Sequence, residues 1–159
     1  MHRNHTVSAR RRAHQIPAGR RIRERRSQVA GWALAHGVGV DRDALAAIVG
    51  ASMPHGDAPD HPALRTGVAE TWTSESVGSL LWDGLLTWCR SNGAIPPDPD
   101  RVRSSLTAYV RYLNSERLLT PDSERTPALR RAITEHGRVG ATDRRPARRR
   151  STAPVVPIA

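Results

Sequence analysis

The chain has 159 residues, a formal net charge of +10 and 38% hydrophobic residues, below the ~45–50% that is usual for a globular domain. Its length allows one domain of ordinary size, and no apolar run approaches the ~18–20 residues that a membrane-spanning helix needs. The single cysteine excludes an intramolecular disulfide framework and any zinc site with several cysteine ligands.

The first predicted element is a disordered arginine-rich arm, residues 1–22. All 25 basic residues of the chain are Arg, and residues 1–26 hold nine of them with one acid, a charge of +8. The segment buries too little apolar surface to offset an ordering entropy of about 1–2 kcal/mol per residue. Its Arg-rich, acid-poor composition is shared by organelle transit peptides, but it lacks the apolar core of a secretory signal. The absence of Lys beside many Arg and Ala suggests GC-rich coding and favours a bacterial cytoplasmic protein.

Two helices are predicted next. Apolar side chains recur at helical spacing over residues 23–36, and Gly37 supplies a stop. Asp41 can cap a second, short helix over residues 42–49, with Gly50 behind it.

A long loop is predicted over residues 51–70, where Pro and Gly break any regular pattern. It contains His55, Asp57, Asp60 and His61. Two histidines with two carboxylates can hold zinc or iron. Asp is also frequent in loops of this composition because it forms turns. We therefore assign no metal or other cofactor, and metal binding by these residues stays open.

The clearest pattern is a helix over residues 73–91, with Thr73 as its cap. Its apolar side chains cover about two-thirds of the circumference, which is typical of a helix surrounded on several sides and predicts the central helix of the domain. Cys89 lies within the apolar arc and is expected to be a buried, inert thiol. Trp82 and Leu86 lie together away from the main apolar side and form a candidate partner surface.

Two further helices complete the predicted fold. Asp98 caps one of them, with Pro99 at its first position, and this capping role is a plainer account of Asp98-Pro99-Asp100 than a metal motif. A single apolar stripe follows at Val102, Leu106, Tyr109 and Leu113. The last helix runs from the Thr126-Pro127 start to His136. No stretch alternates long enough to require a strand, so we expect an all-α domain of about five helices over residues 23–137.

A second disordered arm is predicted over residues 138–159, rich in Arg and Pro and carrying a charge of +5. Residues 27–137 carry −3. By this count the folded domain is mildly acidic, and the positive charge lies in its two arms.

Two resemblances bear on the fold. The first rests on Leu81-Trp82, Trp88-Cys89, Pro96-Pro97-Asp98, Tyr112-Leu113, Leu118 and Pro121-Asp122-Ser123. These residues resemble a pattern in small uncharacterised proteins of high-GC Gram-positive bacteria, which implies an all-helical domain over residues 23–137 and nothing catalytic. Residues 85–93 and 109–113 are similar to the helical DNA-clamping domain of tyrosine recombinases. That likeness implies a DNA-binding fragment, since no catalytic domain follows here.

The arginine clusters favour a non-enzymatic nucleic-acid-binding module. The chain has no glycine-rich phosphate loop, Gly-x-Ser-x-Gly elbow or His-Glu-x-x-His helix. Phosphate contacts are predicted for Arg10, Arg11, Arg12, Arg20, Arg21, Arg144, Arg145, Arg148, Arg149 and Arg150. The arms contain no aromatic residue, so contact without sequence readout is expected. The alternative is a protein-interaction domain or homodimer that uses the 73–91 helix, with functionally neutral arms.

Overall fold

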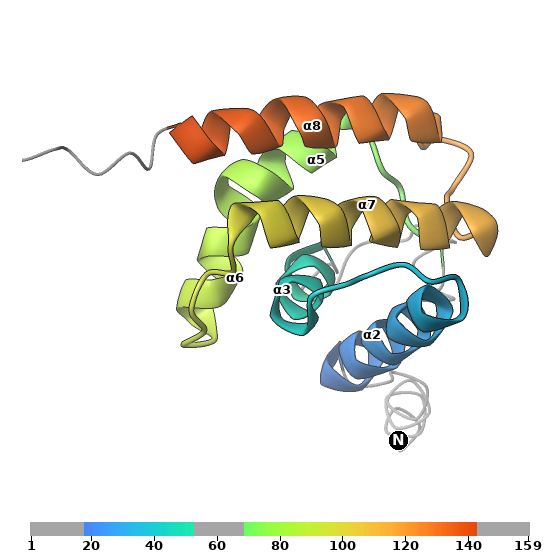
Figure 1. Ribbon diagram of the computed structural model, residues 1–159, viewed down its shortest axis with the longest axis horizontal. Coiled ribbons are helices and arrows are strands. Elements are labelled where there is room, and N and C mark those ends of the chain that lie inside the picture. The colour runs from blue at the N-terminus through green and yellow to red at the C-terminus, as the bar shows by residue number, and fades with distance from the viewer. Residues whose placement is uncertain (1–17, 53–68, 143–159) are drawn as a thin grey trace, which may run out of the picture.

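The computed structural model describes residues 18–52 and 69–142, the last five of these by their backbone alone. These ranges form five helices (Figure 1): α2 (Ala18–Ala35), α3 (Arg42–Ser52), a continuous helix made of α5 (Ser74–Ser79), η1 (Leu80–Gly84) and α6 (Leu85–Ser91), then α7 (Pro99–Ser115) and α8 (Thr126–Thr142). They contain no β-strand, and the predicted all-α fold of about five helices is confirmed.

The two outer helices are longer than predicted. Helix α2 begins at Ala18 rather than near residue 23, and α8 continues to Thr142. Arg20 and Arg21, which the sequence places in a disordered arm, therefore lie in the first turn of α2. Arginine is a good helix former, and the Arg20–Glu24 pair at i, i+4 supports this turn. The rest of both predicted arms lies outside the described residues.

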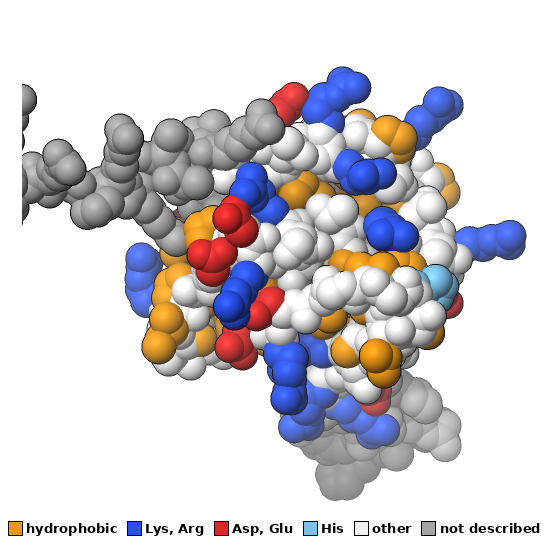
Figure 2. All heavy atoms as spheres, viewed as in Figure 1, with side chains coloured by type: hydrophobic (Ala, Val, Ile, Leu, Met, Phe, Trp, Pro, Cys, Tyr) orange, Lys and Arg blue, Asp and Glu red, His pale blue; other side chains and the backbone are white. Residues whose placement is uncertain are grey.

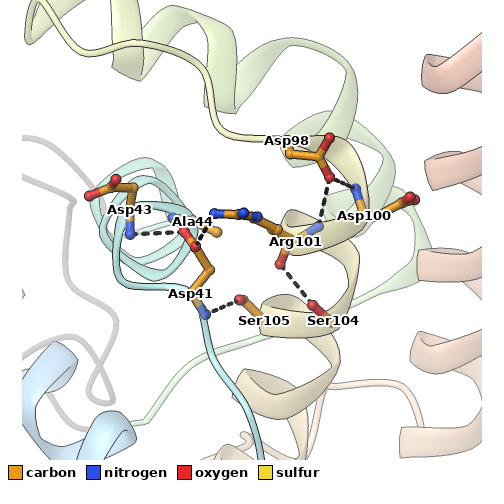
Figure 3. A network of polar contacts seen from close by, with 8 residues as sticks. All are labelled: Asp41, Asp43, Ala44, Asp98, Asp100, Arg101, Ser104 and Ser105. Atoms are coloured by element: carbon orange, nitrogen blue, oxygen red, sulfur yellow. Dashed lines mark hydrogen bonds and ion pairs between the residues drawn. The ribbon is translucent and has the colours of Figure 1, made fainter.

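Three predicted helix caps are confirmed. The Asp41 carboxylate accepts hydrogen bonds from two backbone N–H groups in the first turn of α3, at 3.1 and 2.9 Å. The Asp98 carboxylate does the same for α7, at 2.9 and 3.2 Å (Figure 3). Thr73 and Ser76 form a reciprocal capping box at the start of α5. Each cap satisfies N–H groups that have no partner within the helix.

Helix α7 occupies the centre of the fold, with α8 along one side and α3 and α2 on the other (Figure 1). Its buried residues are Val102, Ser105, Leu106, Ala108, Tyr109, Val110, Tyr112 and Leu113. The prediction that the 73–91 helix is central is wrong. That helix packs against α3 and α8 but leaves Trp82 47% exposed. A broad apolar arc in the sequence therefore marks a helix that is only partly enclosed.

A π-helical turn explains part of this error. The Leu85 N–H donates to the carbonyl of Leu80, five residues back, instead of four. The wider turn shifts the side chains that follow relative to a regular wheel of 3.6 residues per turn. Beyond it, the Trp88 indole packs so closely on Gly50 of α3 that a Cβ at Gly50 would collide with the ring.

A short extended segment, residues 69–72, pairs with residues 118–120 behind α7. The Glu70 N–H donates to the Leu118 carbonyl at 2.7 Å, and the Thr120 N–H donates to the Glu70 carbonyl at 2.9 Å. This single parallel bridge fixes the Glu70 side chain beside α2 and α7.

Candidate nucleic-acid interface

The structure describes two of the ten arginines that the sequence assigns to phosphate contacts, Arg20 and Arg21 of α2. The others lie outside the described residues: Arg10, Arg11, Arg12, Arg144, Arg145, Arg148, Arg149 and Arg150. Figure 2 shows basic side chains at the lower edge of the molecule, where α2 lies.

The start of α2 presents arginine outward. Arg20 and Arg23 are exposed and, three positions apart, share the outer side of the helix. The Arg20 Nε lies 2.9 Å from the Glu24 Oε1, with both side chains largely in solvent. An exposed i, i+4 pair of this kind contributes about 0.3–0.5 kcal/mol, so a phosphate can replace the carboxylate at little cost.

Arg25 faces the other way and is buried. Its Nε lies 3.4 Å from the Glu70 Oε1, and its Nη1 donates to the Tyr112 hydroxyl at 3.5 Å. Sequence reasoning counted Arg25 within the positive N-terminal segment, but its position makes it part of the protein interior. Glu70 lies 45 positions from Arg25 in the sequence, so no local sequence pattern predicts this pair.

Glu70 also accepts hydrogen bonds from two further side chains. The Tyr109 hydroxyl donates to its Oε1 at 2.5 Å, and the Trp72 Nε1 donates to its Oε2 at 2.9 Å. Burial first, and then the charge of Glu70, raise the pKa of Tyr109 well above its ordinary value, so this phenol stays protonated. We name Arg25, Glu70, Trp72 and Tyr109 the Glu70 cluster. It joins α2, residues 69–72 and α7 and is structural.

An aromatic stack lies where α2 meets α7. The His36 ring stacks on Trp32 with ring centroids 4.5 Å apart, and the Arg111 guanidinium lies 5.9 Å from the centroid of the Trp32 ring. No described residue accepts a hydrogen bond from the buried Trp32 Nε1, so ring contacts hold this side chain. His36 and Arg111 are exposed, and the stack fixes an arginine on the surface of the domain.

Trp82 and Leu86, the predicted partner surface, lie on the helix formed by α5, η1 and α6. The Trp82 Nε1 donates to the His136 Nδ1 of α8 at 3.3 Å, while half of the side chain meets solvent. Leu86 is half-buried and lines a small pocket of about 60 Å³. The other lining residues are Leu81, Leu85, Pro96, Pro97, Pro99, Val102, Arg103, His136 and Gly137.

Other candidate chemistry finds little support among the described residues. Cys89 is buried as predicted, and burial raises the pKa of its thiol, which disfavours the nucleophilic thiolate. His55, Asp57, Asp60 and His61 lie outside the described residues. Within residues 18–52 and 69–142, no three His, Cys, Asp or Glu side chains gather as metal ligands would.

No protein-family model, curated protein or solved structure matches the chain. The two resemblances noted in the sequence therefore stay predictions. None of the helices over residues 18–52 and 69–142 combines the length and apolar character needed to cross a bilayer.

Proposed function

We propose that this chain is a non-enzymatic helical module that binds nucleic acid through its phosphates, using arginines near both ends of the sequence. The observation that supports it best is the start of α2. Residues 20–26 contain five arginines and one glutamate, and of these only Arg25 is buried. They continue the Arg10-Arg11-Arg12 cluster, with no acid between the two groups.

Arginine suits this task chemically. The guanidinium stays charged at any relevant pH and donates two parallel hydrogen bonds to a phosphate. Such contacts position a protein on nucleic acid without reading the bases. A nucleic-acid partner also agrees with a cytoplasmic protein, as the composition suggests.

The first test is the salt dependence of binding. Fluorescence anisotropy would follow the full chain with a 20-base-pair DNA duplex of arbitrary sequence and with single-stranded RNA of equal length. If 6–10 phosphates are contacted, affinity falls about 10³–10⁵-fold between 50 and 200 mM salt. An affinity that does not change with salt concentration, or no binding to either probe at 50 mM salt, refutes the proposal.

A second test locates the contacts on α2. The double variant Arg20→Gln, Arg21→Gln should lower the slope of log affinity against log salt by about 1.8, since each lost phosphate contact releases about 0.9 fewer counterions. The matched control is Arg42→Gln, Arg90→Gln, which removes the same charge from exposed positions on α3 and α6. Equal slopes for both double variants would remove α2 from the interface.

A homodimer through the 73–91 helix is the second candidate. One observation favours it: Trp82 is half exposed beside the apolar pocket lined by Leu86, Pro96 and Pro97. Large aromatic side chains are enriched at protein interfaces. A second copy of the chain could cover Trp82 and the pocket together.

Mass in solution tests this alternative. Analytical ultracentrifugation of the full chain over a wide concentration range would detect a dimer, and Trp82→Ala should shift it toward monomer. Leu34→Ala is the matched control, since Leu34 is an exposed large apolar side chain on α2. A monomer at every concentration, or equal shifts by both variants, would rule out this interface.

A further inference from the structure

Helices α7 and α8 carry a positive charge that counting along the chain conceals. Over their described side chains they hold five arginines and two carboxylates, although residues 27–137 sum to −3. The two helices lie antiparallel and side by side (Figure 1). Figure 2 shows basic side chains spread over α8 and the end of α7, with most acidic side chains of this face near the start of α7.

Packing between the helices aligns three of these arginines. Arg103 of α7 lies so close over Gly137 of α8 that a Cβ there would collide with it, so the start of α7 packs against this part of α8. Thr107 and Arg111 follow Arg103 at i+4 and i+8 on α7, in a row that turns about 80° around the helix, from α8 toward Trp32 of α2. On α8, Gly137 shares its stripe with Thr134 and Arg130, three and seven positions earlier. We name Arg103, Thr107, Arg111, Arg130 and Thr134 the α7–α8 basic face.

Carboxylates contribute little to this face. Asp100 lies at the start of α7 and bonds to Arg103. Glu135 is five positions from Arg130, which places it about 140° around α8 and away from α7. The hydroxyls of Thr107 and Thr134 donate to carbonyls of their own helices, at 2.8 and 3.0 Å, and add no charge. Among the described residues Asp100 therefore neutralises Arg103, whereas Arg111 and Arg130 form no ion pair with a carboxylate.

Arg111 is also preorganised. Its guanidinium lies over the Trp32 ring, which is itself fixed by His36 and by an edge contact with Tyr112. An arginine held on an aromatic ring loses less side-chain entropy when it binds, and its N–H groups at the edge of the guanidinium still reach a phosphate. An arginine that is present only because the chain is rich in arginine would not need an aromatic ring to hold its guanidinium.

We infer that the α7–α8 basic face is a second phosphate-contact surface, so that the nucleic acid lies along the folded domain as well as on the arms. Arg103 and Arg111 are eight residues apart, about 12 Å along the helix, far enough to contact different phosphates of one nucleic acid. An extended row of cations suits the repeated phosphates of a nucleic-acid backbone. This inference rests on the proposed function.

The test compares three double glutamine variants and one double lysine variant of the full chain in the same binding assay. Arg111→Gln with Arg130→Gln removes two arginines of the face, Arg20→Gln with Arg21→Gln removes two from α2, and Arg42→Gln with Arg90→Gln is the control. The face variant should lose about 10- to 100-fold in DNA or RNA affinity at 100 mM salt, and about 1.8 in salt slope. Arg111→Lys with Arg130→Lys should keep the slope, because charge is retained. Urea unfolding checks that each variant is folded at the assay temperature.

The outcomes separate the two proposals. If the wild-type chain binds and the face variant matches the control, this inference is wrong while the proposed function stands. If the wild-type chain does not bind at 50 mM salt, both fail. A loss of affinity for poly-glutamate as large as the loss for nucleic acid would assign the face to an acidic protein partner and overturn the inference.

Discussion

Two arginine–carboxylate pairs join distant parts of this chain in opposite surroundings. Arg25 and Glu70 meet in the interior, with side chains 5% and 17% exposed, and connect α2 to residues 69–72. Arg101 and Asp41 meet at the surface, 68% and 23% exposed, and connect α7 to the start of α3 (Figure 3). Charge interactions strengthen as water is excluded, and so does the penalty for an unpaired charge. The same kind of ion pair therefore stabilises the fold in the interior, at Arg25 and Glu70, and contributes little at the surface, at Arg101 and Asp41.

The two carboxylates, Glu70 and Asp41, also differ in where their hydrogen-bond donors come from. Glu70 accepts from Tyr109 and Trp72 as well as from Arg25, and all three donors come from different segments of the chain. Asp41 accepts mainly from the first turn of its own helix, and its link to Arg101 is an exposed addition at 3.1 Å. Breaking the first pair should loosen three segments, whereas breaking the second should affect one helix start.

The largest effect is expected from Arg25→Ala. It leaves the partly buried Glu70 carboxylate without its cation and should destabilise the fold by about 3 kcal/mol, as is usual when one partner of a buried pair is removed. Urea unfolding followed by circular dichroism measures this loss. Arg23→Ala, an exposed neighbour on α2, is the control and should change stability by less than about 0.5 kcal/mol. Equal losses would mean that the Glu70 cluster does not anchor α2.

Tyr109→Phe should give the next largest effect. The substitution removes only the hydroxyl that donates to Glu70 at 2.5 Å, a hydrogen bond to a charged group worth about 1.5–3 kcal/mol. Tyr112→Phe is the comparison variant, since its hydroxyl donates to the neutral Gln28 side chain at 3.2 Å and accepts from Arg25 only at 3.5 Å, so it should contribute less, about 0.5–1.5 kcal/mol. Urea midpoints that rank the two variants in the reverse order would contradict this account of the cluster.

The sequence predicts these two regions unequally, and distance along the chain is the reason. Asp41, Thr73 and Asp98 bond to groups two or three residues ahead, so local spacing was enough to identify them as caps. Arg25 and Glu70 meet only because the whole domain folds, and no periodicity joins positions 45 apart.

The candidate sites also depend on contacts between residues that are far apart in the sequence. Arg111 stands over Trp32 from 79 positions away, and the α7–α8 basic face depends on Arg103 packing over Gly137. Counting charge along the chain placed Arg103, Arg111 and the rest of the α7–α8 basic face in a mildly acidic segment, residues 27–137. Likewise, a regular wheel over residues 73–91 could not anticipate the π-turn at Leu80–Gly84.

A smaller effect is expected at Asp41, and pH should reveal it. Hydrogen bonding from the Ala44 N–H, with a further contribution from Arg101, lowers the pKa of Asp41 in the folded protein below its ordinary value of 3.8. A lowered folded-state pKa gives stability that is present above the unfolded-state pKa and lost as pH falls through the folded value. Asp41→Asn keeps the cap without the titration, so below about pH 4 it should lose less stability than the wild type.

Thermal unfolding between pH 6 and pH 3 makes the comparison, with Asp43→Asn as an exposed control two residues away. Asp41→Ala, which removes the cap itself, should cost about 1 kcal/mol at pH 7. Parallel pH profiles for the wild type and Asp41→Asn would show that Asp41 does not carry this acid sensitivity.

The smallest effect is expected from Arg101→Ala, which completes the contrast with Arg25. The exposed pair with Asp41 should contribute about 0.2–1 kcal/mol at low ionic strength. Since the Debye length falls to about 3 Å at 1 M salt, the difference between wild type and Arg101→Ala should shrink toward zero in 1 M NaCl. The effect of Arg25→Ala should persist there, because little water or salt reaches that pair. Unfolding both variants at 50 mM and 1 M NaCl distinguishes the pairs, and an Arg101→Ala loss that survives 1 M NaCl would place its contribution in packing of the side-chain stem rather than in charge.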